Sequence, residues 1–191
     1  MGEYSLFFKR WIKNPRQLGT FAPISKRISK KAALCIPNPT TAKIVDFGAG
    51  TGPEIQAFLD IGVKPENITA IELDLEFAAY LKQRYPQIHV VHGDVCYAKD
   101  LIPKSWNGKV DIVFSAIPFM YIPQAVREKI TEVAFSILHP KGRFLHLTYS
   151  LWSPLETYKK ERLVSLWANL PPVFIWRYYP KVEHMEFKKV A

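Results

Sequence analysis

Some features are scarce or missing in this sequence, and each absence narrows what it can do. No run of roughly 18 apolar residues occurs, so we expect no membrane-spanning helix. The first residues do not read as a secretory signal, because Lys9, Arg10 and Lys13 interrupt the apolar positions. The two cysteines, Cys35 and Cys96, lack metal-site spacing and sit beside predicted core elements. We therefore expect reduced thiols, a cytoplasmic protein and no metal site.

Internal repeats, low-complexity segments and clear linkers are also absent. The chain has 191 residues, of which 48% are hydrophobic, so it can bury one α/β core and is short for two. We expect a single domain over residues 1–191, with residues 1–34 forming a basic, helical N-terminal cap.

Acidic residues are few relative to basic ones: 17 against 26, for a net charge of +9. Residues 1–33 hold much of this excess, with eight basic side chains and one acidic side chain. Such an excess favours an anionic partner, which is either a nucleic acid or a membrane surface.

The first residues also carry an aromatic stripe. Between Tyr4 and Ile12, apolar residues recur at helical spacing, while basic residues fall on the opposite side. This pattern is typical of a helix that lies in a lipid interface. A helix that folds its aromatic stripe onto the domain would produce the same pattern, and the two interpretations are compatible. The predicted membrane-binding residues are Phe7, Phe8, Lys9, Arg10, Trp11 and Lys13.

The most informative segment is the glycine-rich turn at residues 43–52. An apolar strand ends at Asp46 and runs into a G-x-G-x-G turn, and a helix is predicted to begin near Pro53. A second carboxylate, Glu72, ends the next apolar run, where an acid can accept both hydroxyls of a ribose. The spacing differs from the dinucleotide pattern G-x-G-x-x-G, so the turn predicts a nucleoside-like ligand without a pyrophosphate.

The remaining pattern predicts a doubly wound α/β sheet, because strands and helices alternate along the chain. After residue 149 the rhythm changes, and two strand-like segments joined by Asn-Leu-Pro-Pro predict an antiparallel hairpin at the sheet edge. The predicted strands are 43–47, 68–72, 88–92, 110–115, 143–149, 161–168 and 173–179, and the predicted helices are 5–13, 23–34, 53–61, 75–84 and 123–138.

Ligands of open α/β sheets bind at the carboxyl ends of the strands, which places Asp46, Glu72, Asp94 and Ser115 along one edge. Asp94 can accept from an adenine amino group, or it can cap the short helix that follows. After the fourth strand, residues 115–119 read Ser-Ala-Ile-Pro-Phe, with serine at the position of asparagine in the N-P-P-[FYW] loop of amino-group methyltransferases. The segment resembles that loop, and the resemblance implies that its carbonyl oxygens accept from a substrate amine.

The turn resembles motif I of class I S-adenosylmethionine-dependent methyltransferases. More discriminating segments resemble the soluble bacterial phospholipid N-methyltransferases, a family related to rRNA adenine dimethylase-like proteins. These segments are residues 14–25, 115–118, 148–154 and 169–179. The resemblance implies a Rossmann-like fold with a seven-stranded, mostly parallel sheet, a C-terminal antiparallel hairpin and N-terminal amphipathic helices.

The resemblance also implies a cofactor, S-adenosyl-L-methionine, which leaves as S-adenosyl-L-homocysteine. The implied cofactor-binding residues are Asp46, Phe47, Gly48, Ala49, Gly50, Gly52, Glu72, Leu73, Asp94, Val95 and Ser115. The implied catalytic residues are Ser115, Pro118, Phe119, Tyr121 and Tyr149.

We therefore expect methyl transfer to the amine of phosphatidylethanolamine at the inner face of the membrane, with later steps toward phosphatidylcholine left open. Two alternatives remain: an adenine N6-methyltransferase acting on rRNA or DNA, and a non-catalytic membrane-surface protein of the same fold. Against the first stand Ser115 in place of asparagine and the lack of an added nucleic-acid domain.

Overall fold

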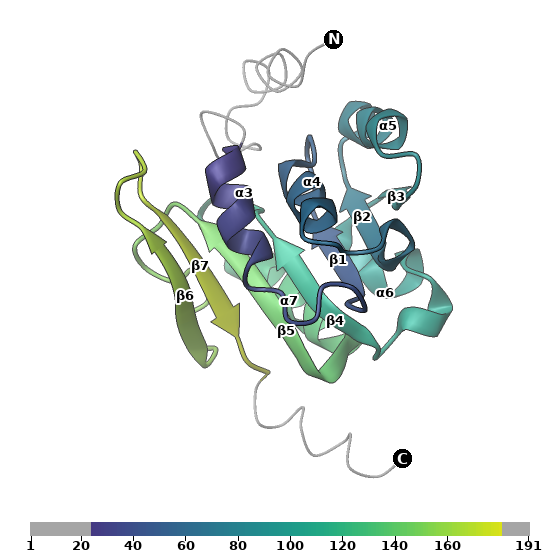
Figure 1. The fold of residues 1–191 in the computed structure, drawn as a ribbon. Coiled ribbons are helices and arrows are strands. Elements are labelled where there is room, and N and C mark those ends of the chain that lie inside the picture. The colour runs from purple at the N-terminus through teal and green to yellow at the C-terminus, as the bar shows by residue number, and fades with distance from the viewer. Residues whose placement is uncertain (1–23, 181–191) are drawn as a thin grey trace.

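The computed structural model describes residues 24–180 of the 191-residue chain (Figure 1). Seven strands form one sheet in the order β3-β2-β1-β4-β5-β7-β6. The strands are β1 (Ile44–Phe47), β2 (Ile68–Glu72), β3 (His89–His92), β4 (Val110–Ser115), β5 (Leu138–Thr148), β6 (Lys160–Leu166) and β7 (Val173–Tyr178).

The first five strands pair in parallel, and β7 pairs antiparallel with both β5 and β6. The sequence-based fold class is therefore confirmed, including the C-terminal hairpin. Parallel pairing brings the carboxyl ends of β1, β2, β4 and β5 to one edge of the sheet, the edge at which such folds bind ligands.

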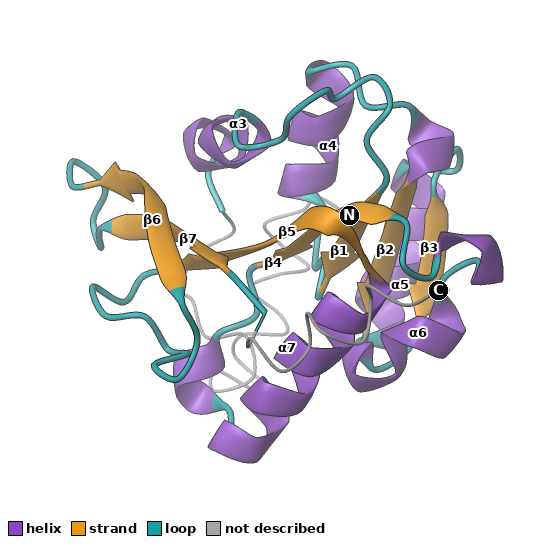
Figure 2. Ribbon diagram, turned by 90° about the horizontal axis from the view of Figure 1, so that it is seen from below, coloured by secondary structure: helices purple, strands orange, loops and turns teal. Residues whose placement is uncertain are grey.

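Helices cover both faces of the sheet (Figure 2). They are α3 (Lys26–Ala33), α4 (Pro53–Asp60), α5 (Leu75–Arg84), α6 (Ala98–Leu101) and α7 (Gln124–Ile137). Helices α3 and α4 lie on one face, and α6 and α7 lie on the other. Helix α3 begins after Ser25, whose hydroxyl accepts from the backbone of Ile28, as is typical of an N-cap.

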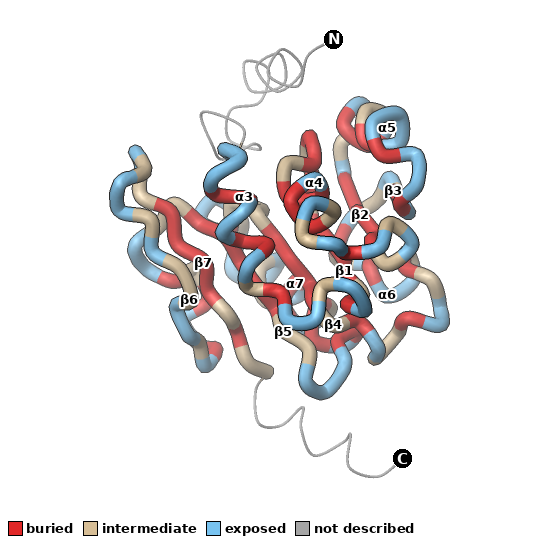
Figure 3. Tube along the Cα trace, viewed as in Figure 1, coloured by how far each residue is buried: buried red, intermediate tan, exposed pale blue. Residues whose placement is uncertain are grey.

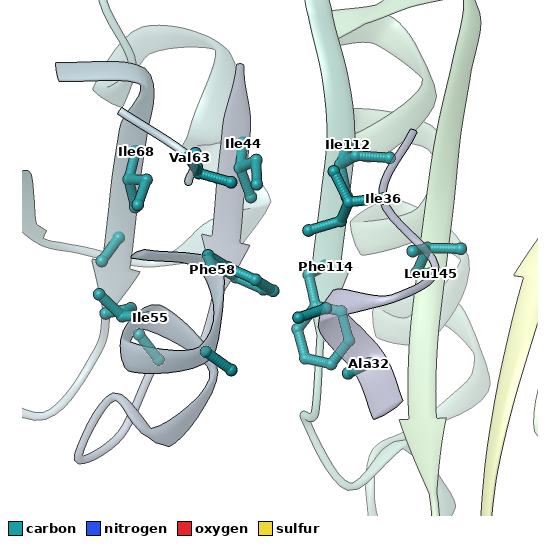
Figure 4. Close-up of a cluster of buried hydrophobic side chains, with 14 of the residues drawn as sticks. Ala32, Ile36, Ile44, Ile55, Phe58, Val63, Ile68, Ile112, Phe114 and Leu145 are labelled. Carbon is teal, nitrogen blue, oxygen red and sulfur yellow. The ribbon is translucent and has the colours of Figure 1, made fainter. Parts of the chain in front are cut away.

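Two hydrophobic clusters fill the space between sheet and helices, which explains why the central strands are buried along their length (Figure 3). On the α3–α4 face, Phe58 of α4 meets Phe114 of β4 edge to face, with ring centroids 5.7 Å apart (Figure 4). Successive residues of β1 point to opposite faces, so Ile44 joins this cluster and Val45 joins the other. By the same alternation, Asp46 points to the α4 side.

Strand β5 is longer than the sequence indicated. We expected His139–Gly142 to end the preceding helix and the strand to begin at residue 143, but α7 ends at Ile137 and β5 begins at Leu138. Leu138 pairs with Val110, and the ladder then shifts before Ile112 meets Arg143. Gly142 permits this bulge, because a Cβ there would lie 2.8 Å from the carbonyl oxygen of Val110.

Several short elements lie between β3 and α7. They are α6 and the 3₁₀ turns η2 (Val95–Tyr97), η3 (Lys104–Trp106) and η4 (Phe119–Tyr121), and a further turn, η1 (Pro65–Asn67), precedes β2. Only a short helix after Asp94 was expected from the sequence, at the place of η2 and α6. Three or four residues carry too little periodicity to distinguish a turn of helix from a loop.

Candidate active site

The glycine-rich turn connects β1 to α4 at the carboxyl edge of the sheet. Gly48, Gly50 and Gly52 have φ angles of 71°, 56° and 76°, in the left-handed region that favours glycine. A Cβ at Gly48 would lie 2.7 Å from Ile117, whereas a Cβ at Gly50 would have nothing within 4 Å. The backbone at Gly50 therefore faces open space, where a ligand can approach it closely.

Asp46 is a buried carboxylate at the end of β1, and only 2% of its surface is exposed. Its Oδ2 has no hydrogen-bond partner among the residues that the structure describes. Burial raises the pKa of Asp46 well above its usual value, and the negative charges of Glu54 and Glu72 raise it further. A buried carboxyl oxygen beside two like charges fits a cationic ligand, because such a ligand would satisfy the oxygen and relieve the repulsion.

Glu72, at the end of β2, holds the glycine-rich turn in place through hydrogen bonds to the backbone. One carboxylate oxygen accepts from the backbone N–H of Gly50 at 2.7 Å, and the other accepts from that of Asp74 at 2.8 Å. Burial raises the pKa of Glu72, and these backbone hydrogen bonds oppose the rise. A carboxylate can accept about four hydrogen bonds, so Glu72 keeps room for a further donor such as a ribose hydroxyl beside its backbone donors.

The remaining predicted cofactor residues line the same edge in different ways. Asp94 is exposed, and its Oδ1 accepts from the N–H of Cys96 at 2.9 Å, which is the helix-capping role left open by the sequence. Leu73 is largely exposed, whereas Val95 is buried in the α6–α7 cluster. The side chains of Phe47 and Ala49 are also core residues, so any contact with a ligand would come from their backbone.

Ser115 and the loop that follows β4 lie beside the glycine turn, because Ser115 pairs with Phe47 in the sheet. The Ser115 side chain is fully buried, and its Oγ accepts from the N–H of Ile117 at 3.2 Å. In this structure, the serine shapes the loop. Pro118 is half-buried at the start of η4.

The aromatic residues proposed for catalysis occupy three different environments. Phe119 is 1% exposed and stacks on His146, with ring centroids 4.3 Å apart. Tyr121 is 66% exposed, and Tyr149 is half-buried directly after β5, where it packs against the α3–α4 cluster. Phe119 thus makes core contacts, whereas Tyr121 and Tyr149 lie at the edge. Their roles toward a substrate stay predictions.

A pocket of about 350 Å³ lies between the start of α7 and the segment that follows β5. Its walls continue from the two predicted catalytic segments, since Met120 follows the Ser115–Phe119 loop and Ser150 follows Tyr149. Arg127 of α7 connects the two sides of the pocket, because its Nη1 donates to the carbonyl oxygen of Pro154 at 2.9 Å. The lining residues are Met120, Gln124, Arg127, Glu128, Ser150, Trp152, Ser153, Pro154, Leu155, Glu156 and Thr157.

Three residues support the site although none of them was predicted as a site residue. Glu54 is buried beside Asp46, and its place directly after the G-T-G-P run was the available signal. Tyr85 donates from its hydroxyl to the carbonyl oxygen of Gly52 at 3.0 Å. His146 lies 2.9 Å from the carbonyl oxygen of Ile117, and burial lowers the pKa of His146 to about 4, so the neutral ring donates this hydrogen bond. The last two contacts span 33 and 29 residues, which no local pattern reveals.

The predicted membrane-binding residues from Phe7 to Lys13 lie outside the described residues. Within residues 24–180, no helix is long and apolar enough to cross a bilayer, and no three His, Cys, Asp or Glu side chains are grouped to hold a metal ion.

Comparison with known proteins identifies the family of this chain. Residues 44–142 match a family described as a methyltransferase domain. An ornithine lipid N-methyltransferase from Singulisphaera acidiphila is 27% identical over 180 residues, which cover 90% of this chain and 93% of that protein.

Solved structures share the fold at low sequence identity. A TehB-like S-adenosylmethionine-dependent methyltransferase from Corynebacterium glutamicum has a TM-score of 0.63 at 18% identity and covers 93% of this chain and 97% of its own. The glycopeptide N-methyltransferase MtfA in complex with S-adenosylmethionine has a TM-score of 0.55 at 19% identity, covering 84% of this chain and 69% of its own. The family match spans more than half of the sequence and includes the glycine turn, Glu72 and the Ser115 loop. The chain therefore belongs to the methyltransferase-domain family and is a class I S-adenosylmethionine-dependent methyltransferase.

Proposed function

We propose that this enzyme methylates the primary amine of a membrane lipid, with phosphatidylethanolamine as the acceptor. The observation that carries the proposal is the pocket beside the Ser115–Phe119 loop. Its lining combines the guanidinium of Arg127 with the carboxylates of Glu128 and Glu156 and the exposed ring of Trp152. Both signs of charge and an aromatic face suit a zwitterionic headgroup that carries a phosphate and an ammonium.

The cofactor half of the site would hold S-adenosylmethionine through residues that the fold already positions. The unpartnered oxygen of Asp46 suits the cationic methionine end, Glu72 suits the ribose hydroxyls, and Asp94 with Val95 suits the adenine. When bound, this cofactor supplies an electrophilic methyl group on a sulfonium, so the protein mainly has to align the two reactants.

On the acceptor side, the protein has to present an amine with a free lone pair. Carbonyl oxygens of residues 115–118 can accept from the amine N–H groups and direct its lone pair toward the cofactor half. His146 fixes the carbonyl of Ile117 through its hydrogen bond, which limits the carbonyl orientations available in this loop.

A second acceptor, the amine of an ornithine lipid, is favoured by one specific observation. The ornithine lipid N-methyltransferase aligns with 90% of this chain. That lipid class also combines an amine with an anionic group, so the same pocket suits it.

Labelled S-adenosylmethionine would test the proposal directly. The protein would be incubated with vesicles containing phosphatidylethanolamine, with vesicles containing ornithine lipid and with RNA, and Glu72→Ala would serve as the inactive control. We expect label in the phosphatidylethanolamine fraction. Label in the ornithine lipid alone would change the acceptor, and label in RNA alone would refute a lipid acceptor.

A further inference from the structure

Three loops meet at the acceptor end of the sheet, although they are far apart in the sequence. Ser115 pairs with His146, so the segment after β4 lies beside the segment after β5. Thr148 pairs with Phe174, and Leu166 pairs with Val173, so the β6–β7 turn lies at the same edge. Figure 1 shows this turn at the top of the hairpin, at the edge toward which β2 and β4 point.

Each of these three loops exposes large apolar side chains to solvent. Trp152 is 77% exposed and Leu170 is 96% exposed, which is far more than side chains of this size and polarity usually show. We call this set of six residues the apolar rim: Met120, Tyr121, Leu151, Trp152, Trp167 and Leu170.

The rim is also free of charge. Residues 112–126, 144–155 and 163–176 contain no Asp, Glu, Lys or Arg, although such residues make up 23% of the chain. The segments at the opposite edge carry Lys104, Lys109, Lys141 and Lys159. Exposed apolar side chains that gather on three uncharged loops mark an interaction surface, because scattered surface apolar residues would be interleaved with charges.

We infer that the apolar rim inserts into the interfacial region of a lipid bilayer and so presents the pocket to the headgroups. Two tryptophans, a tyrosine and aliphatic tips are the residue types that settle at a membrane–water interface. Met120 and Trp152 belong both to the rim and to the pocket wall, so insertion would bring the pocket mouth to headgroup depth. The acyl chains of an acceptor would then stay in the bilayer while its headgroup enters the pocket.

The biological meaning of this inference rests on the proposed lipid acceptor, but the rim can be tested without catalysis. Full-length protein would be sedimented with vesicles of phosphatidylcholine and phosphatidylglycerol, which offer no primary amine, in the absence of cofactor. The double variant Trp152→Ser/Leu170→Ser should partition roughly tenfold or more weakly than the wild type. Both positions are largely exposed, so the fold should tolerate the changes.

Leu34→Ser is the matched control for this experiment. Leu34 is 70% exposed but follows α3 at the opposite edge, next to Cys35, whose carbonyl oxygen accepts from Arg143. Arg143 pairs with Ile112 near the start of β4, which fixes that edge. The control should bind vesicles as the wild type does. Equal binding by the rim variant would overturn the inference. So would a dimer in solution that the rim variant dissociates, because the rim would then be an interface between copies of this chain.

A second measurement reports the rim even if another part of the chain supplies most of the affinity. Vesicles containing brominated lipids should quench tryptophan fluorescence less in Trp152→Phe/Trp167→Phe than in the wild type. An equal absolute loss of fluorescence intensity in the variant and the wild type would mean that neither ring reaches the bilayer and would overturn the inference. Methylation of a lipid acceptor together with unaltered vesicle binding by the rim variant would refute the rim and leave the proposed function intact.

Discussion

Replacing Asp46 with asparagine should weaken cofactor binding and, at the same time, stabilise the cofactor-free protein. Burial and the charges of Glu54 and Glu72 raise the pKa of Asp46 in the folded state. The contribution of Asp46 to the free energy of unfolding is therefore fully present below the unfolded pKa of about 4. It is lost as the pH rises through the folded pKa, because the buried carboxyl group then has to ionise. At neutral pH, Asp46→Asn removes the unfavourable burial of an acid beside two like charges. If the free energy of unfolding rises by about 1 kcal/mol, the Tm should rise by roughly 2–4 °C in a domain of this size.

The affinity for the cofactor should fall in the same variant, although the stability of the protein rises. A charge-assisted hydrogen bond contributes about 1.5–3 kcal/mol, so losing one should weaken the Kd for S-adenosylmethionine roughly 10- to 150-fold. A bound cation also lowers the pKa of Asp46, so wild-type affinity should increase with pH, and this dependence should flatten in the variant.

Calorimetry at several pH values and thermal unfolding together test this reasoning. Asp111→Asn is the control, because Asp111 also sits beside β1 but accepts from the N–H of Lys43 at the opposite edge of the sheet. Two results would refute the argument: wild-type affinity in Asp46→Asn, or a lower Tm in this variant than in the wild type.

Three further changes probe the site and its supports. Gly48→Ala should lower the free energy of unfolding more than Gly108→Ala. Both glycines have a φ of 71°, but only a Cβ at residue 48 would clash, at 2.7 Å from Ile117. Urea unfolding measures both losses, and equal losses would contradict the clash. His146 contributes about 3 kcal/mol to the free energy of unfolding as a neutral ring above pH 6.5, and this contribution is lost as the pH falls to about 4. The free energy of unfolding of His146→Leu should therefore differ less between pH 7.5 and pH 4 than that of the wild type. Glu72→Gln should weaken S-adenosylmethionine binding by roughly tenfold or more, because one acceptor oxygen becomes a donor, and unchanged affinity in calorimetry would remove Glu72 from the ribose role.

The sequence predicted those parts of the fold that rest on local rules. The run from β1 through the glycine turn to α4 follows from strand periodicity, three positive φ angles and a proline in the first helical turn. The hairpin followed from two β-rich segments around Asn169–Pro172. The carboxyl ends of parallel strands then brought Asp46, Glu72 and Ser115 to one edge.

Other features were not visible because they depend on contacts between distant segments. The early start of β5 depends on the pairing of Leu138 with Val110, and the loop carbonyl held by His146 depends on a residue 29 positions away. Exposure is equally non-local: Phe119 looked like a site residue and is core, whereas Trp152 was predicted only as part of a family motif and is one of the most exposed side chains.

The edge of the sheet divides into two halves with different chemistry, and this division leads to a last prediction. Carboxylates surround the ends of β1 and β2, whereas the residues that directly follow β4 and β5, as far as 126 and 155, carry no charge. The boundary falls between the adjacent strands β1 and β4, where the strand order reverses and a crevice forms in such sheets. Reactants held on either side of this boundary would meet without a moving part, because neighbouring strands lie about 4.8 Å apart.

If each half binds its own reactant, changes in the two halves should act independently. Asp46→Asn should alter the Kd for S-adenosylmethionine but not vesicle partitioning, and Trp152→Ser should do the reverse. For methyl transfer to lipid, the free-energy losses of the double variant should add to within about 0.5 kcal/mol, as they do for sites without shared partners. Measured kcat/KM values give these losses, and a larger coupling would show that the two halves form one interdependent site.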